Sequence, residues 1–253
     1  MQIRTTRILL STLTLCLSAL TAKAEQVSVR LMGIETNRSD LYIKQGADFE
    51  VVYVPLYQNS PVYQLELEGR ALQLYTKIET PEGPRYELLV EGKLPRDAES
   101  ALGIYLIAPN GRPQLYFYSD DWSDFPKRSY RLINISPVVI SSKIDEKLTQ
   151  VQPLKSEVVK VGSKSSLPSV SVITVYKDEN DQWKSIFDQR VPLRSDWRTT
   201  GIAVVTDGKL QESINPDYKV DRSKPVKSTL SFFSFTDDAL TSAQRAAQRM
   251  QAQ

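Results

Sequence analysis

The sequence predicts an all-β protein made of two consecutive antiparallel β-sandwich domains with a short C-terminal helix. Short runs rich in β-branched and aromatic residues recur about 8–12 residues apart, with turn residues between them. Residues 25–236 lack the long 3.6-residue apolar period of an amphipathic helix. Asn110-Gly111 separates two apolar runs and is a hairpin signal, because both residues tolerate positive φ. These features indicate many short strands joined by tight turns.

Residues 1–24 have the pattern of a secretory signal peptide. Arg4 and Arg7 precede an apolar run at 8–20, and Ala22-Lys23-Ala24 matches a cleavage site. The apolar run is too short to span a bilayer comfortably. We therefore expect a periplasmic or secreted mature protein with no membrane span after cleavage.

The expected strands follow period-2 alternation bounded by turn residues. In the segment 62–68, for example, Tyr63, Leu65 and Leu67 share one face, while glutamine and glutamate occupy the other. In the first half the predicted strands are 27–31, 41–43, 49–54, 62–68, 72–78, 86–90, 102–108 and 115–118. In the second half they are 130–135, 138–144, 148–151, 157–161, 170–176, 183–191, 201–205, 210–214 and 226–235.

A joint in the middle of the chain sets the domain limits. The polar run 120–124 predicts an exposed loop, and Pro126 fixes its own φ and keeps the residue before it extended. We therefore expect the two sandwiches to meet near residues 123–128. The predicted limits are 1–24 for the signal peptide, 25–126 and 127–236 for the two domains, and 237–253 for a C-terminal helix or tail.

The second domain is predicted to open with a hairpin. Tyr130 and Leu132 face one side of its first strand, and Arg131 and Ile133 face the other. A proline follows this strand, and the next strand begins directly after it. At the other end of the domain, Asp237 is a candidate N-cap for the C-terminal helix.

Composition narrows the chemistry of the mature chain. Residues 25–253 contain neither cysteine nor histidine, because Cys16 lies in the leader. Disulfides, the usual zinc, copper and haem ligands, and histidine-dependent nucleophilic catalysis are therefore excluded. We expect no enzyme activity, no cofactor and no bound transition metal.

The two halves differ in charge. Residues 25–127 carry 10 basic and 16 acidic residues, whereas 128–253 carry 19 basic and 14 acidic ones. This asymmetry predicts electrostatic docking of separable domains, with a contact that loosens in high salt. No dense basic patch with interleaved aromatics is present, so we expect no nucleic-acid partner.

Part of the chain resembles a known group of proteins. The run 119–136 combines an acidic loop, Phe125-Pro126 and the strand sequence Arg131-Leu132-Ile133-Asn134, and the segment 138–161 follows it as a hairpin. This region resembles uncharacterised exported β-sandwich proteins of environmental Gram-negative bacteria. It is more distantly similar to the β-sandwich repeats of the periplasmic alginate acetylation accessory protein. The resemblance implies a non-catalytic envelope β-sandwich and assigns no functional residues.

Carboxylate clusters suggest two chemistries, each with a simpler alternative. The first cluster, Asp120, Asp121 and Asp124, offers oxygen ligands for calcium, but it lacks the glycine and terminal glutamate of an EF-hand loop, and a solvated loop explains it better. The pair Glu66 and Glu68 shares a strand face and offers two carboxylates to a glycosidase. The exposed face of an amphipathic strand explains this pair better.

Aromatic residues give the alternative function. Trp122, Trp197, Tyr116 and Tyr118 are candidates for stacking on sugar rings, and core packing is the competing explanation. The favoured function is a structural or interaction accessory of the cell envelope, and the alternative is a carbohydrate-binding module that uses these aromatics. The expected partners are envelope proteins or polysaccharide, and the oligomeric state stays open.

Overall fold

The computed structural model describes residues 25–67, 69–162, 169–206 and 229–238. Within these ranges the protein is all-β, with sixteen strands and no helix. The predicted all-β class is therefore confirmed. The strands form four sheets of four strands each, and every sheet uses strands from only one half of the chain.

The first half forms two sheets. Their orders are β4-β1-β7-β8 and β3-β2-β5-β6. The strands are β1 (Glu25–Ile34), β2 (Arg38–Gln45), β3 (Asp48–Val54), β4 (Tyr63–Leu67), β5 (Ala71–Thr80), β6 (Gly83–Lys93), β7 (Ser100–Ile107) and β8 (Pro113–Ser119). Residues from both sheets fill one apolar core, so the two sheets pack face to face.

The second half forms the other two sheets, with orders β12-β9-β15-β16 and β11-β10-β13-β14. The strands are β9 (Ser129–Ile135), β10 (Ile140–Ile144), β11 (Lys147–Val151), β12 (Ser156–Lys160), β13 (Ser169–Lys177), β14 (Trp183–Pro192), β15 (Trp197–Thr206) and β16 (Thr229–Asp238). These sheets also enclose an apolar core of their own.

Two expectations about strand pairing are wrong. The sheets are not purely antiparallel, because β1 pairs with β7 and β9 pairs with β15 in parallel. The strands β9 and β10 do not form a hairpin, since β9 pairs with β12 and β15 while β10 belongs to the opposite sheet. Both faces of β9 are buried, so its neighbours along the chain cannot cover it alone.

The predicted C-terminal helix does not begin at Asp237. This residue lies in β16 and pairs with Arg198 of β15, and its carboxylate forms ion pairs with Arg198 and Arg30. The ladder and these ion pairs hold Asp237 in an extended strand. The rest of the predicted helix, like the signal peptide and the strand predicted at 210–214, lies outside the described residues.

The two halves repeat one topology. Adding eight to each strand number converts the first two sheet orders into the second two, and it converts the parallel pair β1–β7 into the parallel pair β9–β15. A register shift falls between Leu74 and Tyr75 in β5, and another falls between Thr174 and Val175 in β13. The repeat therefore extends to the level of single residues.

Matching glycines confirm the shared register. Gly103 pairs with Leu31, and Gly201 pairs with Leu132. A Cβ atom on Gly103 would lie 2.6 Å from the Phe117 ring, and one on Gly201 would lie 2.4 Å from the Phe232 ring. Each glycine therefore makes room for an aromatic ring on the neighbouring strand.

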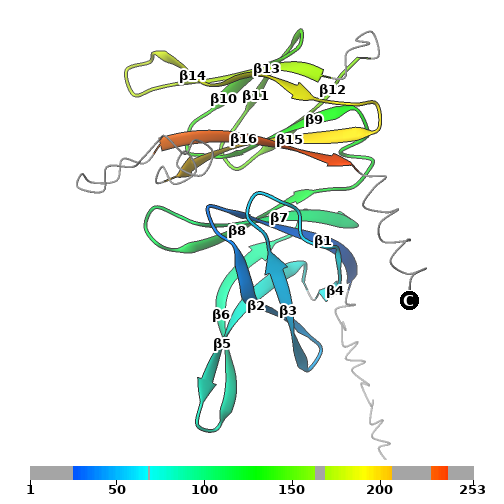
Figure 1. Ribbon diagram of the computed structural model, residues 1–253, viewed down its shortest axis with the longest axis vertical. Coiled ribbons are helices and arrows are strands. Elements are labelled where there is room, and N and C mark those ends of the chain that lie inside the picture. The colour runs from blue at the N-terminus through cyan, green and yellow to red at the C-terminus, as the bar shows by residue number, and fades with distance from the viewer. Residues whose placement is uncertain (1–24, 68, 163–168, 207–228, 239–253) are drawn as a thin grey trace, which may run out of the picture.

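The four sheets stack as four layers along the long axis of the molecule (Figure 1). The sheets β4-β1-β7-β8 and β12-β9-β15-β16 are the inner layers. A third apolar cluster lies between them and takes residues from both halves, among them Met32, Ile104, Ile133 and Ile202. The halves thus share a buried apolar interface in addition to their own cores.

Candidate functional site

The two tryptophans proposed as sugar platforms each lie beneath an arginine. Trp122 follows β8 and is 49% exposed, and the guanidinium of Arg198 lies 4.2 Å from its ring centroid. Trp197 is half-buried at the start of β15, and the guanidinium of Arg194 lies 4.5 Å from its ring centroid. A sugar would reach only the other face of each ring.

The two tyrosines proposed with them lie on β8, at the interface between the halves. Tyr118 is 6% exposed within the shared apolar cluster, and burial raises the pKa of its hydroxyl. Tyr116 packs partly against the same cluster and donates a 2.8 Å hydrogen bond to Gln114. The ring of Tyr118 is not accessible to a ligand in this structure. Sugar binding by these residues and the two tryptophans stays a prediction.

The acidic loop after β8 is exposed at residues 122–124 but buried at its first residue. Asp120 is 5% exposed, so the expectation for this residue is wrong. Asp121 is half-buried and accepts hydrogen bonds from the backbone nitrogens of Glu99 and Ser100. Asp124 is exposed and accepts a hydrogen bond from Ser119. The three carboxylates therefore serve three separate local roles and do not converge on a common point.

Asp120 belongs to a buried group of five charged residues between the halves, here named the charge cluster: Arg30, Asp120, Arg131, Arg198 and Asp237. Asp120 pairs with Arg30, with Arg131 at 3.3 Å and with Arg198 at 3.6 Å. Asp237 pairs with Arg30 at 2.7 Å and with Arg198 at 3.0 Å. Three of these five ion pairs join residues of different halves.

The charge cluster is also a product of the repeat. Arg30 directly precedes Leu31, the partner of Gly103, and Arg131 directly precedes Leu132, the partner of Gly201. The two arginines therefore occupy equivalent positions. Asp237 lies three residues after the partner of Gly201, and Asp120 lies three residues after the partner of Gly103. Each half therefore contributes one equivalent arginine and one equivalent aspartate to the interface.

The charge cluster shifts the pKa values of its members in different directions. Burial alone would raise the pKa of Asp120, but three neighbouring guanidiniums outweigh burial and lower it. Burial lowers the pKa of Arg131 to about 10, because desolvation and two like charges outweigh the attraction of Asp120. Three arginines against two aspartates leave one excess positive charge. The Phe125 ring, whose centroid lies 4.3 Å from the Arg131 guanidinium and 4.8 Å from that of Arg198, helps to offset it.

A second site opens on the outer sheet of the first half, where β2 and β5 separate. Only two pairs join these strands, Leu41 with Thr76 and Tyr42 with Tyr75. The equivalent strands β10 and β13 are joined by five pairs. Aligning the register shift of β5 with that of β13 gives the equivalent positions in the two halves. The three further pairs of the second half join residues 142–144 to 172–174. Their equivalents in the first half are residues 43–45 and 72–74. The first half therefore lacks three rungs that the second half retains.

Core residues differ at the point of separation. In the second half, the hydroxyls of Ser142 and Thr174 lie 2.7 Å apart across the ladder. The equivalent residues are Ile43 and Leu74, which are bulkier and fully buried. Close to the opening, the side-chain nitrogen of Gln45 is buried and has no hydrogen-bond partner among the described residues.

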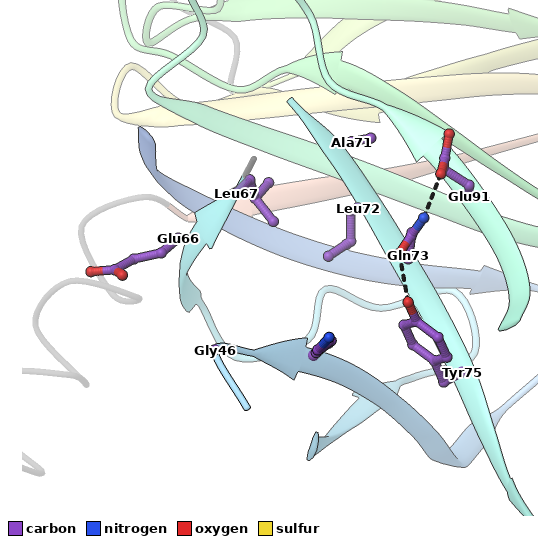
Figure 2. Close-up of a pocket in the computed structure, with 9 residues that line it drawn as sticks. Gly46, Glu66, Leu67, Ala71, Leu72, Gln73, Tyr75 and Glu91 are labelled. Atoms are coloured by element: carbon purple, nitrogen blue, oxygen red, sulfur yellow. Dashed lines mark hydrogen bonds between the residues drawn. The ribbon is translucent and has the colours of Figure 1, made fainter. Parts of the chain in front are cut away.

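The separation of β2 and β5 forms a pocket of about 380 Å³. Leu67 and Leu72 border the pocket from the core side and are only 6% and 2% exposed, and their side chains point toward one another in Figure 2. Along β5 and β6, Tyr75 donates a 2.5 Å hydrogen bond to Gln73, which donates a 2.7 Å bond to Glu91. The pocket thus has a polar wall, and the half-buried ring of Tyr75 is its aromatic member. Its lining is completed by Lys44, Gly46, Glu66 and Ala71.

An aromatic cluster adjoins the pocket on the same sheet. Phe49 stacks on Tyr86 with ring centroids 4.0 Å apart, and Tyr42 meets Tyr86 edge to face at 5.1 Å. Tyr75, which lines the pocket, meets Phe49 edge to face at 5.0 Å. These rings lie on the side of the sheet opposite its core residues, and Tyr75 connects them to the pocket. The sequence reasoning missed this cluster, although alternation along each strand places the four rings on one face.

The pocket offers binding groups and no evident catalytic pair. Glu66 points away from the other labelled side chains, and Glu91 accepts the hydrogen bond of Gln73 (Figure 2). Among the described residues, no group of three or more histidine, cysteine, aspartate or glutamate side chains is placed to hold a metal ion.

Comparison of the chain with protein-family models and with curated proteins finds no match. Within the described ranges, no helix has the length and apolar character needed to cross a membrane.

Proposed function

We propose that the protein is a non-catalytic, exported accessory of the cell envelope that binds its partner through the outer sheet of its first half. The observation that carries this proposal is the opening between β2 and β5. The two halves repeat one topology, yet the first leaves three rungs unpaired where the second keeps them. Unpaired backbone groups cost stability unless water or a ligand satisfies them. A pocket retained at that cost favours a binding role.

In this proposal the halves are two sandwich domains, 25–126 and 127–236, with different tasks. The first presents the pocket, and the second supports it through the shared apolar cluster and the charge cluster. Support for the division comes from the separate core inside each half. The strands β2 and β5 face away from the interface between the halves, so a partner can reach them without opening it (Figure 1).

A non-catalytic role agrees with the chemistry available in the chain. Residues 25–253 lack histidine and cysteine, so the common nucleophile–base pairs are missing. Two carboxylates that face each other across a cleft would favour glycoside hydrolysis, but Glu66 points away from Glu91. The signal-peptide pattern of residues 1–24 supports export.

Photo-crosslinking in living cells tests this proposal. A photoreactive amino acid replaces Lys44 at the pocket or, as a matched control, Lys143 at the equivalent position of the second half. We expect adducts from position 44 in the envelope or periplasmic fraction, and few from position 143. Equal adducts from both positions, no adducts, or a cytosolic protein would contradict the proposal.

A further inference from the structure

The walls of the pocket match one class of ligand in their chemistry. Gln73 and Glu91 are planar polar side chains held in place by the relay from Tyr75. Lys44 supplies an ammonium group that forms no ion pair with any described residue. The lining thus offers both hydrogen-bond donors and acceptors. Such a wall suits a ligand with many hydroxyl groups, because each hydroxyl both donates and accepts hydrogen bonds.

The size of the opening argues against an extended peptide. The ladder is closed at the pair Tyr42 and Tyr75, so the opening spans three residues on each strand. At about 3.4 Å per residue in an antiparallel strand, that length is about 10 Å. A peptide that added a strand to the sheet would need a longer free edge. The volume of about 380 Å³ instead fits a small ligand or the end of a chain.

The charges of the lining argue against an anion. Lys44 is the only cationic residue, whereas Glu66 and Glu91 are both acidic. An acidic ligand would meet a net negative lining. A neutral ligand meets no such penalty and still finds both donors and acceptors.

The aromatic cluster extends the pocket in the direction that a sugar chain would use. Tyr75 belongs to both features, and the rings of Phe49, Tyr42 and Tyr86 continue across the outer sheet. Aromatic rings offer apolar surface to the C–H face of a sugar ring. A polar wall that continues through Tyr75 into aromatic rings is complementary to a saccharide, which has both polar and apolar surface.

We infer that the pocket between β2 and β5 binds the end of a neutral saccharide chain. A terminal sugar packs its apolar face on the half-buried ring of Tyr75, and its hydroxyl groups bond to Gln73, Glu91 and Lys44. The following sugars lie over the aromatic cluster. This inference rests on the proposed function, because it names the ligand class of the same binding face.

The test is a titration of the mature protein with five pentasaccharides, followed by NMR shifts of the backbone amides. The probes are the neutral malto-, cello-, chito- and manno-oligosaccharides and the acidic alginate oligomer. We expect at least one neutral probe to shift amides of residues 44–46 and 71–75. Gln73→Ala and Lys44→Ala should each weaken binding by about tenfold, the loss expected for one or two hydrogen bonds. The matched control Lys143→Ala should bind like the wild type.

Three outcomes overturn the inference: no neutral probe shifts the pocket amides, only the alginate probe binds, or the pocket variants bind like the wild type. Ala71→Phe, which places a ring in the pocket, gives a second check if Gln73→Ala misfolds, and it should abolish the shifts. If crosslinks still form from position 44 while no neutral saccharide binds, the accessory role stands and only the ligand class fails. If position 44 gives no crosslinks and no neutral saccharide binds, both proposals fail.

Discussion

Asp120 shows how far a residue's environment can differ from its sequence context. Its neighbours Asp121, Ser123 and Asp124 suggest a solvated loop, yet its carboxylate is buried against three arginines. Those arginines come from positions far along the chain, at 30, 131 and 198. A local pattern reports polarity correctly here and gives no sign of the partners, because the partners depend on how the halves meet.

The buried carboxylate makes stability depend on pH. The pKa of Asp120 is lowered in the folded protein, whereas an aspartate in an unfolded chain has a pKa of about 3.9. Its contribution is therefore fully present above about pH 4 and is lost as the pH falls through the folded pKa. We expect Asp120→Asn to reduce the free energy of unfolding by about 3 kcal/mol at pH 7, because the arginines lose a buried counter-charge. Urea unfolding between pH 2 and pH 7 measures both effects.

Glu99→Gln provides the control for this experiment. Glu99 is exposed and lies near the same loop, and its hydrogen bonds to Asp121 and Ser28 use its backbone nitrogen and carbonyl oxygen. Its substitution should change the free energy of unfolding by less than about 0.5 kcal/mol. The difference between wild type and Asp120→Asn should shrink below pH 4. If it stays constant across the pH range, Asp120 does not carry a depressed pKa.

At the scale of single elements, the sequence predicted positions well and partners poorly. Period-2 alternation located β4, β5 and β13, because one face of each strand packs on a core. The parallel pairing of β1 with β7 left no local signal, since the two strands are separated by most of the first half. Asp237 was predicted to cap a helix, although its partners Arg30 and Arg198 hold it in a strand.

The candidate pocket was not predictable for a related reason. It arises from pairs that are missing between β2 and β5, and a missing rung leaves no mark in either strand's own sequence. The repeat itself has a weak signal in the matched positions of Gly103 and Gly201. That signal becomes visible only once the register is known.

The open ladder predicts a difference in hydrogen exchange between equivalent strands. Amides of 43–45 and 72–74 that point into the opening lack the strand partner that protects their counterparts at 142–144 and 172–174. We expect a subset of the former to exchange at least about tenfold faster, because their opening does not require unfolding of the sheet. Exchange followed residue by residue in NMR spectra measures this difference.

The paired residues of the same strands are an internal control. Amides at 41–42 and 75–76 should exchange as slowly as those of β10 and β13, since their rungs are intact. Fast exchange at these positions too would mean that the whole first half is less stable. In that case the opening would not be a local feature of β2 and β5.

At the scale of the whole molecule, two cores and one interface make a continuous stack. The interface combines an apolar cluster drawn from both halves with the buried charge cluster. The charge asymmetry of the sequence suggested docking through exposed opposite fields, which salt would screen over about 8 Å. Buried pairs and apolar contacts respond much less to salt, so the structure favours a tighter attachment than the charge counts implied.

Coupling between the halves is the strongest consequence of this arrangement. Leu74 lies in the core of the first half and contacts no residue of the second half's core. If the halves unfold as one unit, Leu74→Ala should destabilise both by the same amount, about 2–5 kcal/mol for a buried leucine. Hydrogen exchange of β13 in increasing urea reports on the second half and should shift with the β5 signal. The radius of gyration should also stay the same between low and high salt. If β13 keeps its wild-type protection while β5 loses it, the halves are independent, and the shared cluster joins two domains without coupling their stability.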